Sequence, residues 1–252
     1  MNYKLTLMYD GTNYAGWQRQ QNAKTIQGEL ERALSVITRE TVSTVGVSRT
    51  DAGVHAARYT ANVHLENPID EYKLFRGVNA LLPEDIRLMS ASLCSDSFNA
   101  RFDAIKKTYL YRIDTSPHGN VFYKNFAWHV PHTLDIEKMQ KAADCFLGSH
   151  DFSGFMAQGG SSKTFTRTIM ESSFSKEDGL LTYRITGNGF LYNMVRIIAG
   201  TLVWVGKGKI SPEDIPSIID AKDRTLAGMT APAHGLTLLE AVYENEIETK
   251  EV

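Results

Sequence analysis

The order of the predicted secondary-structure elements limits the possible folds of this chain more than any other feature. Residues 3–9 alternate apolar and polar side chains, as a strand does. Ile26, Leu30 and Leu34 recur at helical spacing, and Thr25 is a suitable N-cap for that helix. The same patterns predict strand, helix, strand, strand, helix and strand at residues 3–9, 25–39, 42–47, 58–65, 70–82 and 86–98.

The second half of the chain repeats this order loosely. Its strands are predicted at residues 108–114, 165–174, 180–187 and 235–243, and its helices at 134–147, 190–205 and 212–221. Two β-α-β-β-α-β units predict two ferredoxin-like halves, at residues 1–104 and 105–252. We therefore expect an α+β fold with a largely antiparallel sheet, helices on one side of it, and a candidate site in the cleft between the halves.

The composition is that of an ordinary soluble globular protein, with 42% hydrophobic and 22% charged residues. Residues 194–205 form the longest apolar stretch, which contains Arg196 and Gly200 and is too short to span a bilayer. We therefore expect no membrane association and a cytoplasmic protein. The net charge of −2 argues against a nucleic-acid coat protein but is compatible with a local basic cleft. The histidines and cysteines lack metal-ligand spacing, so no metal is expected.

The sharpest local feature is the short polar segment 48–55, with the sequence SRTDAGVH, which directly follows a predicted strand. Arg49 and Asp51 are separated by one residue and would share a face of an extended chain. On local chemistry alone, a turn in which Asp and Gly satisfy backbone requirements explains the segment at least as well as a catalytic role. The segment therefore needs support from the rest of the chain.

That support comes from a resemblance that extends over nearly the whole chain. The string RTDAGVHA at residues 49–56 resembles the signature of the tRNA pseudouridine synthase A family, with Ser48 where the usual form has Gly. Further segments resemble other family motifs and follow one another in the family order. They are YDGTNYAGWQRQ (9–20), KTIQGELERAL (24–34), FNARFDAIKKTYLYRI (98–113), GNGFLYNMVRIIAGTL (187–202) and APAHGLTL (231–238).

The resemblance implies an isomerase that converts uridine to pseudouridine in tRNA. The family expectation is uridine in the anticodon stem-loop, at tRNA positions 38, 39 and 40. The base detaches from the ribose and re-attaches through C5, with no redox change or phosphate transfer, so no cofactor is expected. The resemblance also implies a homodimer, with tRNA as substrate.

The resemblance assigns three catalytic positions. Asp51 matches the catalytic aspartate, whose ionised carboxylate acts as nucleophile or base; the sequence leaves open whether it attacks C1′ or removes a proton from C2′. Arg196 matches the arginine that pairs with this aspartate, and a cation there favours the charged carboxylate. Tyr109 matches a tyrosine that stacks on the target base, although cross-strand packing explains an aromatic there equally well.

A second group of residues is interpreted as RNA contacts, because they lie next to these positions in sequence and carry groups that bind phosphate or polar edges. For any one of them, ordinary surface charge is an equally good explanation. The group consists of Arg49, His55, Arg58, Gln18, Arg19, Lys106 and Lys107.

Other functions remain as alternatives. Asp10-Gly11-Thr12 follows a strand, as in haloacid-dehalogenase phosphatases, but Met8 stands where that pattern requires a second Asp. Residues 206–209, GKGK, follow a helix instead of opening one and make a poor phosphate loop. A non-catalytic RNA-binding module also has ferredoxin-like sheets with aromatic residues, but no RNP1-like string is present. Action on another RNA, or on another region of tRNA, also stays open.

Overall fold

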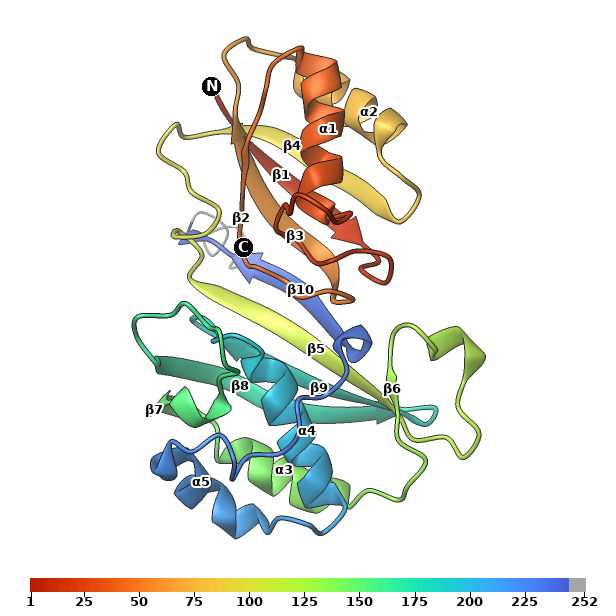
Figure 1. Ribbon diagram of the computed structural model, residues 1–252, viewed down its shortest axis with the longest axis vertical. Coiled ribbons are helices and arrows are strands. Elements are labelled where there is room, and N and C mark those ends of the chain that lie inside the picture. The colour runs from red at the N-terminus through yellow and green to blue at the C-terminus, as the bar shows by residue number, and fades with distance from the viewer. Residues whose placement is uncertain (245–252) are drawn as a thin grey trace, which may run out of the picture. The chain divides into compact units, whose positions relative to one another are not determined.

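The computed structural model describes residues 1–244 and shows an α+β protein (Figure 1). Within these residues there are five α-helices and ten strands, and most strand pairs are antiparallel. The chain divides into two compact units. Unit 1 contains Met1–Ile105 together with the chain from Thr237 onward, and unit 2 contains Lys106–Leu236.

Unit 1 has the element order β-α-β-β-α-β that the sequence predicts. Its strand order is β4-β1-β3, and β2 pairs with β3 in antiparallel fashion. The third strand begins at His55, inside the signature, and so earlier than predicted. The elements are β1 (Asn2–Tyr9), α1 (Ile26–Thr38), β2 (Thr44–Gly46), β3 (His55–His64), α2 (Glu71–Leu81) and β4 (Ile86–Cys94).

Local chemistry explains these elements well. Tyr3, Leu5 and Leu7 are fully buried, whereas the residues between them are more exposed, so β1 has one covered face and one open face. The Thr25 side chain caps α1 by accepting a hydrogen bond from the Gly28 N–H. Asp70 caps α2 in the same way. The two helices pack against each other, and α2 packs against β4.

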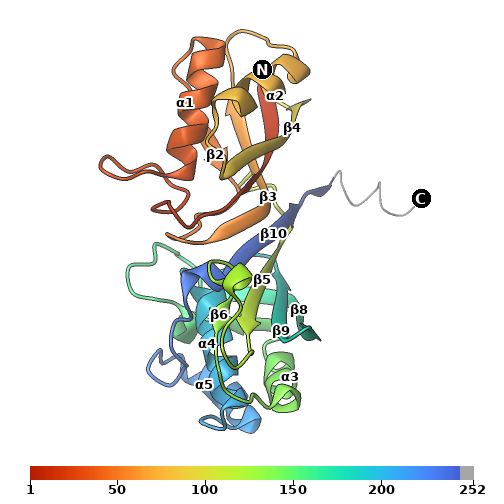
Figure 2. The same ribbon diagram turned by 90° about the vertical axis from the view of Figure 1, so that its right-hand side faces the viewer.

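Unit 2 contains a four-stranded antiparallel sheet in the order β5-β9-β8-β7, and β6 pairs in parallel with β5. Figure 2 shows α3 and α4 beside strands of this sheet. Helices α3 and α4 pack against each other, and α3 also contacts β8. The elements are β5 (Lys106–Asp114), β6 (Trp128–His129), α3 (Ile136–Asp144), β7 (Gly148–Asp151), β8 (Thr166–Glu177), β9 (Leu180–Gly187), α4 (Met194–Gly206) and α5 (Ile215–Ala221).

The last strand, β10 (Leu236–Val242), carries the chain into unit 1. Thr237 and Leu238 pair in parallel with His55 and Ala56 of β3. The Val242 carbonyl oxygen accepts a hydrogen bond from the Ile105 N–H at 2.9 Å. Unit 1 is therefore built from two separate stretches of chain, because the pairing of β10 with β3 places the residues after Leu236 in it.

Some predicted bounds in unit 2 are wrong. Helix α3 ends at Asp144 instead of residue 147, and Gly148, with φ of +93°, begins β7, which has no apolar alternation to reveal it. Helix α4 begins at Met194 and not at residue 190, because Asn193 adopts a left-handed conformation with φ of +60°. Phe190 therefore lies outside α4, although it continues the apolar spacing of that helix.

The described residues were also considered as membrane spans and as metal ligands. No helix among residues 1–244 is long and apolar enough to cross a bilayer. The same part of the chain contains no group of three or more His, Cys, Asp and Glu side chains that could hold a metal ion.

Candidate active site

Asp51 lies at the start of a tight turn between β2 and β3. The Val54 N–H donates to the Asp51 carbonyl oxygen at 3.1 Å, and Gly53 takes a φ of +79°, which glycine adopts without strain. Asp51 is half-buried, Arg49 is exposed and Thr50 between them is buried. The turn therefore directs Thr50 into the protein and leaves Asp51 at the surface of the fold.

The loop after β1, residues 10–22, holds the Asp51 turn in place through its backbone. The Trp17 N–H donates to the Thr50 carbonyl oxygen at 3.0 Å, and the Gly53 N–H donates to the Tyr14 carbonyl oxygen at 3.3 Å. Gly16 lies so close that a Cβ atom would come 2.4 Å from the Thr50 carbonyl oxygen. The two segments therefore form one interlocked unit, and the position of Asp51 depends on both.

Gly16→Ala tests this close contact. The new Cβ would displace the Asp51 turn, and the φ of +92° adds strain of about 1 kcal/mol or more. We expect a lower melting temperature and a fall in turnover of about tenfold or more, since small displacements of reacting groups are costly. Gly159→Ala is the control, because Gly159 has a similar φ of +85° with no atom within 4 Å of the new Cβ. Equal activity losses in both variants would contradict the role of the contact.

Aromatic side chains of unit 1 hold the residues that lead into the Asp51 turn. The Tyr9 hydroxyl and Thr50 Oγ1 form a buried hydrogen bond of 2.9 Å. The Tyr59 hydroxyl donates to the Ser48 carbonyl oxygen, and its ring stacks on Trp17 with 4.0 Å between centroids. The segment that precedes Asp51 is therefore tied to the core of unit 1.

Tyr9→Phe removes one of these ties while keeping the ring. We expect a loss of about 1–3 kcal/mol of stability, because Thr50 Oγ1 loses its buried partner, together with a several-fold lower kcat. Tyr3→Phe is a matched control on the same strand, since the Tyr3 hydroxyl bonds to the backbone of Ile69, away from the turn. Thermal unfolding and steady-state turnover separate the two effects. A drop in kcat of the same size in Tyr3→Phe would contradict a positioning role for Tyr9.

His55 is buried directly behind the turn. Its Nδ1 lies 3.0 Å from the Gly11 nitrogen and 3.0 Å from Asp10 Oδ1. An Nδ1 without a hydrogen accepts from the Gly11 N–H, whereas an Nδ1 that carries a hydrogen donates to Asp10, so the ring makes one of these two hydrogen bonds at a time. With 2% of its surface exposed, His55 is placed to support the loops; an RNA contact requires the structure to open there.

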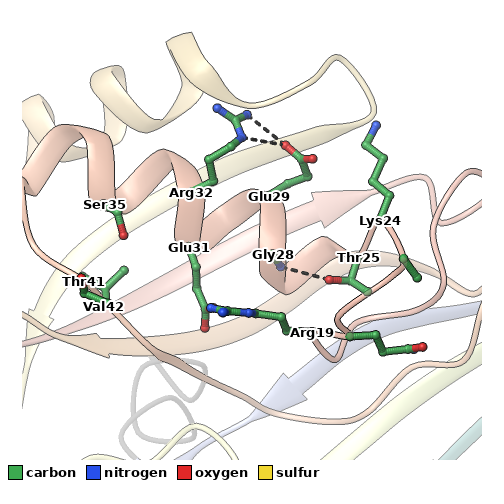
Figure 3. A pocket seen from close by; sticks show the side chains of 12 residues that line it. Arg19, Lys24, Thr25, Gly28, Glu29, Glu31, Arg32, Ser35, Thr41 and Val42 are labelled. Carbon is green, nitrogen blue, oxygen red and sulfur yellow. Dashed lines mark hydrogen bonds and ion pairs between the residues drawn. The ribbon is translucent and has the colours of Figure 1, made fainter.

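The other residues of unit 1 that are predicted to contact RNA lie on different elements. Gln18 is exposed in the loop after β1, and Arg58 is exposed on β3. Arg19 turns toward α1, where its Nη1 lies 3.4 Å from Oε2 of the buried Glu31 (Figure 3). Arg19 there lines a pocket of about 310 Å³, whose Arg32 also pairs with an acidic neighbour, Glu29. Two of its cations are thus paired with carboxylates, and Asp51 is not among its lining residues.

In unit 2, Tyr109 lies on β5 with 6% of its surface exposed. Its ring meets Phe190 edge-to-face, with 5.2 Å between centroids. Lys106 and Lys107 precede it on the same strand and are half-buried. The Tyr109 ring is therefore packed in this structure, and the packing with Phe190 fixes its orientation.

Arg196 lies in the first turn of α4, and two hydrogen bonds orient its guanidinium group. Nε donates to the Ala231 carbonyl oxygen at 2.8 Å, and Nη1 donates to Asn193 Oδ1 at 2.7 Å. The Ala231 N–H in turn donates to the Arg196 carbonyl oxygen at 3.1 Å. The left-handed conformation of Asn193 and the segment around Ala231 thus serve to aim Arg196.

Tyr111 is buried beside Arg196. Its hydroxyl donates to the Pro232 carbonyl oxygen at 2.8 Å. Burial raises the pKa of the Tyr111 hydroxyl, and the positive charge of Arg196 opposes that rise. Tyr111 therefore remains a neutral donor that fixes the segment next to Ala231.

Comparisons with known proteins identify the family of this chain. The family model described as tRNA pseudouridine synthase matches residues 6–103 and 142–244. A protein from Acetivibrio thermocellus named tRNA pseudouridine synthase A is 47% identical over 96% of this chain and 99% of its own length. One of the same name from Bacillus licheniformis is 46% identical over 97% of this chain and 100% of its own. The chain belongs to the tRNA pseudouridine synthase A family.

Sequence reasoning missed several residues that position the site of this tRNA pseudouridine synthase A family member. Tyr9 and Trp17 stand inside the motif 9–20, but their contacts with Thr50 depend on how the loops meet. Tyr59 follows the signature in sequence and gives no local signal of its hydrogen bond. Asn193 directly precedes α4, where an Asn with φ above zero is an expected type of residue.

Proposed function

We propose that this protein isomerises uridine to pseudouridine in tRNA. The observation that carries the proposal is family membership over nearly the full chain, and the segments around Asp51 and Arg196 lie within the residues that the family model matches. In this reaction the N1–C1′ bond breaks and a C5–C1′ bond forms, while C5 loses a proton and N1 gains one. Atoms and electrons balance without an oxidant or a phosphate donor, so the proposal needs no cofactor.

Asp51 is the proposed nucleophile or base. The interlocked loops hold its backbone from both flanks, which is the pre-organisation that a reacting carboxylate needs. Half-burial leaves the side chain accessible to a nucleotide.

Arg196 and Tyr109 complete the proposed catalytic group. We infer that Arg196 pairs with Asp51 in the working enzyme, because its guanidinium is already aimed by Asn193 and Ala231 and a cation stabilises the ionised carboxylate. Tyr109 is the proposed stacking partner of the target base, with Phe190 bracing its ring. We further propose that the chain forms two ferredoxin-like halves, each with its helices on one side of the sheet.

The proposed substrate region is the anticodon stem-loop, and the proposed enzyme is a cytoplasmic homodimer. A uridine near a loop can be turned out of its helix at lower cost than one inside a long stem. Arg49, Arg58, Gln18, Arg19, Lys106 and Lys107 are proposed to contact the RNA, mostly at phosphates, and His55 to support them. Arg49 is the strongest of these, because it is exposed beside Asp51.

Mapping of pseudouridine tests the proposed position. Unmodified tRNA transcripts are incubated with the protein, and each pseudouridine is located by chemical derivatisation and primer extension. We expect pseudouridine in the anticodon arm alone. Pseudouridine in another arm would contradict the anticodon assignment, and an unchanged transcript would contradict the proposed activity itself.

A further inference from the structure

The turn between β4 and β5 presents an aromatic side chain to solvent. Phe102 has 77% of its surface exposed. The Arg101 guanidinium lies over the ring, 5.5 Å from its centroid. Both residues belong to the family-like segment 98–113, and none of the catalytic roles above uses them. A large exposed ring beside a cation is typical of a binding site.

This turn is held rigidly, although it lies at the surface. Asn99 Oδ1 accepts hydrogen bonds from the backbone N–H groups of Arg101 and Phe102, at 3.0 and 3.1 Å. The Asn99 N–H donates to Asp103 Oδ2 at 2.8 Å, and the Asp103 N–H donates to the Asn99 carbonyl oxygen at 3.1 Å. Four hydrogen bonds thus fix the backbone that carries the exposed ring.

Buried polar side chains tie the same turn to the core of unit 1. The fully buried Ala100 receives a hydrogen bond from the Tyr243 hydroxyl on its carbonyl oxygen, at 2.7 Å. Its N–H donates to Oδ1 of the buried Asn62 at 2.9 Å. Asn62 also donates to Oδ1 of the buried Asn2, at 3.1 Å. Such a satisfied polar network rigidifies the turn, so the fold holds the backbone that carries Phe102 in place.

A rigid, exposed aromatic ring with an adjacent guanidinium suits the face of a nucleobase. Bases stack on aromatic rings and on Arg planes, and Arg also reaches the neighbouring phosphate. A ring carried on a fixed backbone loses only side-chain freedom on binding, which limits the entropy cost. Bases inside a duplex have both faces covered by their neighbours, so the fitting ligand is an unpaired or extruded base.

We propose that Phe102 and Arg101 form a stacking site for an unpaired nucleobase of the bound tRNA. The site is additional to the one that receives the target uridine. It rests on the proposed function only in that tRNA is the ligand, and it contributes to binding before any bond is broken. Phe102 provides the stacking surface, and Arg101 provides the charge that holds the adjoining phosphate.

Equilibrium binding of unmodified tRNA tests this site directly. We expect Phe102→Ala to weaken tRNA binding by about 5- to 100-fold, the usual range for loss of one stacked base. Phe102→Trp should retain affinity within about twofold. Its added indole should also give stronger fluorescence quenching on tRNA addition than the wild-type tryptophans do. Thermal unfolding of each variant should match that of wild type, since the side chain is exposed.

Tyr72→Ala is the matched control. Tyr72 lies on α2, outside the segment 98–113, with 64% of its surface exposed, and Arg76 lies 5.9 Å from its ring centroid. We expect no change in its tRNA affinity. Unchanged binding by Phe102→Ala, equal weakening in Tyr72→Ala, weakening in Phe102→Trp, or no extra quenching would each overturn the stacking site. Turnover by wild type reports separately on the proposed function.

Discussion

Asp51→Asn is expected to abolish turnover without weakening the binding of tRNA. The amide keeps the size of the side chain but can neither attack the sugar nor take up a proton, so turnover should fall by at least about 1,000-fold. The backbone bonds of the Asp51 turn involve Thr50, Gly53 and Val54 and do not depend on the carboxylate. Affinity for tRNA should therefore stay within about twofold of wild type. Single-turnover kinetics and equilibrium binding measure the two quantities.

Asp70→Asn serves as the control for this substitution. Asp70 caps α2 by accepting from the Lys73 N–H at 3.0 Å, and Asn caps a helix equally well. The same chemical change should therefore leave turnover and stability unchanged there. Turnover by Asp51→Asn at more than about a tenth of the wild-type rate would exclude Asp51 as nucleophile or base.

Arg196→Lys is expected to lower kcat by about 100-fold with little change in KM. A single ammonium cannot hold the Ala231 carbonyl oxygen and the Asn193 side chain together while presenting a planar edge to a carboxylate. The charge would remain but its position would shift, and shifts of about 1 Å near reacting groups are costly. Steady-state kinetics on tRNA separate kcat from KM.

Arg224→Lys is the control that separates two roles of Arg196, which are to position its guanidinium for Asp51 and to hold the segment around Ala231. Arg224 also holds the segment next to α4, through the Gly228 carbonyl oxygen at 2.9 Å and Thr230 Oγ1 at 3.2 Å. Both arginine variants should lower the melting temperature, because each loses contacts with this segment. Arg196→Lys alone should lose most of its kcat. Equal losses of kcat would mean that Arg196 acts only by bracing the segment.

Local signals in the sequence predict much of the fold. Thr25 and Asp70 identify the starts of α1 and α2, and both side chains form the predicted caps. Local signals fail where distant contacts decide. The start of α4 depends on Asn193, whose left-handed conformation accompanies its hydrogen bond to Arg196. The return of β10 to unit 1 depends on pairing with β3, far away in sequence.

In the candidate site too, the sequence predicts some features, whereas others depend on contacts between distant residues. The signature identifies Asp51 through resemblance, but the residues that hold its turn come from three separate elements. Tyr9 ends β1, Trp17 lies in the following loop, and Tyr59 lies on β3. Alternation predicts that each aromatic strand residue is buried, but which backbone group its hydroxyl meets depends on the tertiary fold.

Release of tritium from tRNA labelled at uridine C5 tests the central claim most directly. Only a reaction that replaces the C5–H bond frees the label, so release reports the isomerisation itself. The wild-type protein, with no added cofactor, should release tritium in an amount equal to the pseudouridine formed. Folded wild-type protein that binds unmodified tRNA and releases no tritium would contradict the assignment as a pseudouridine synthase, and would favour a non-catalytic RNA-binding protein.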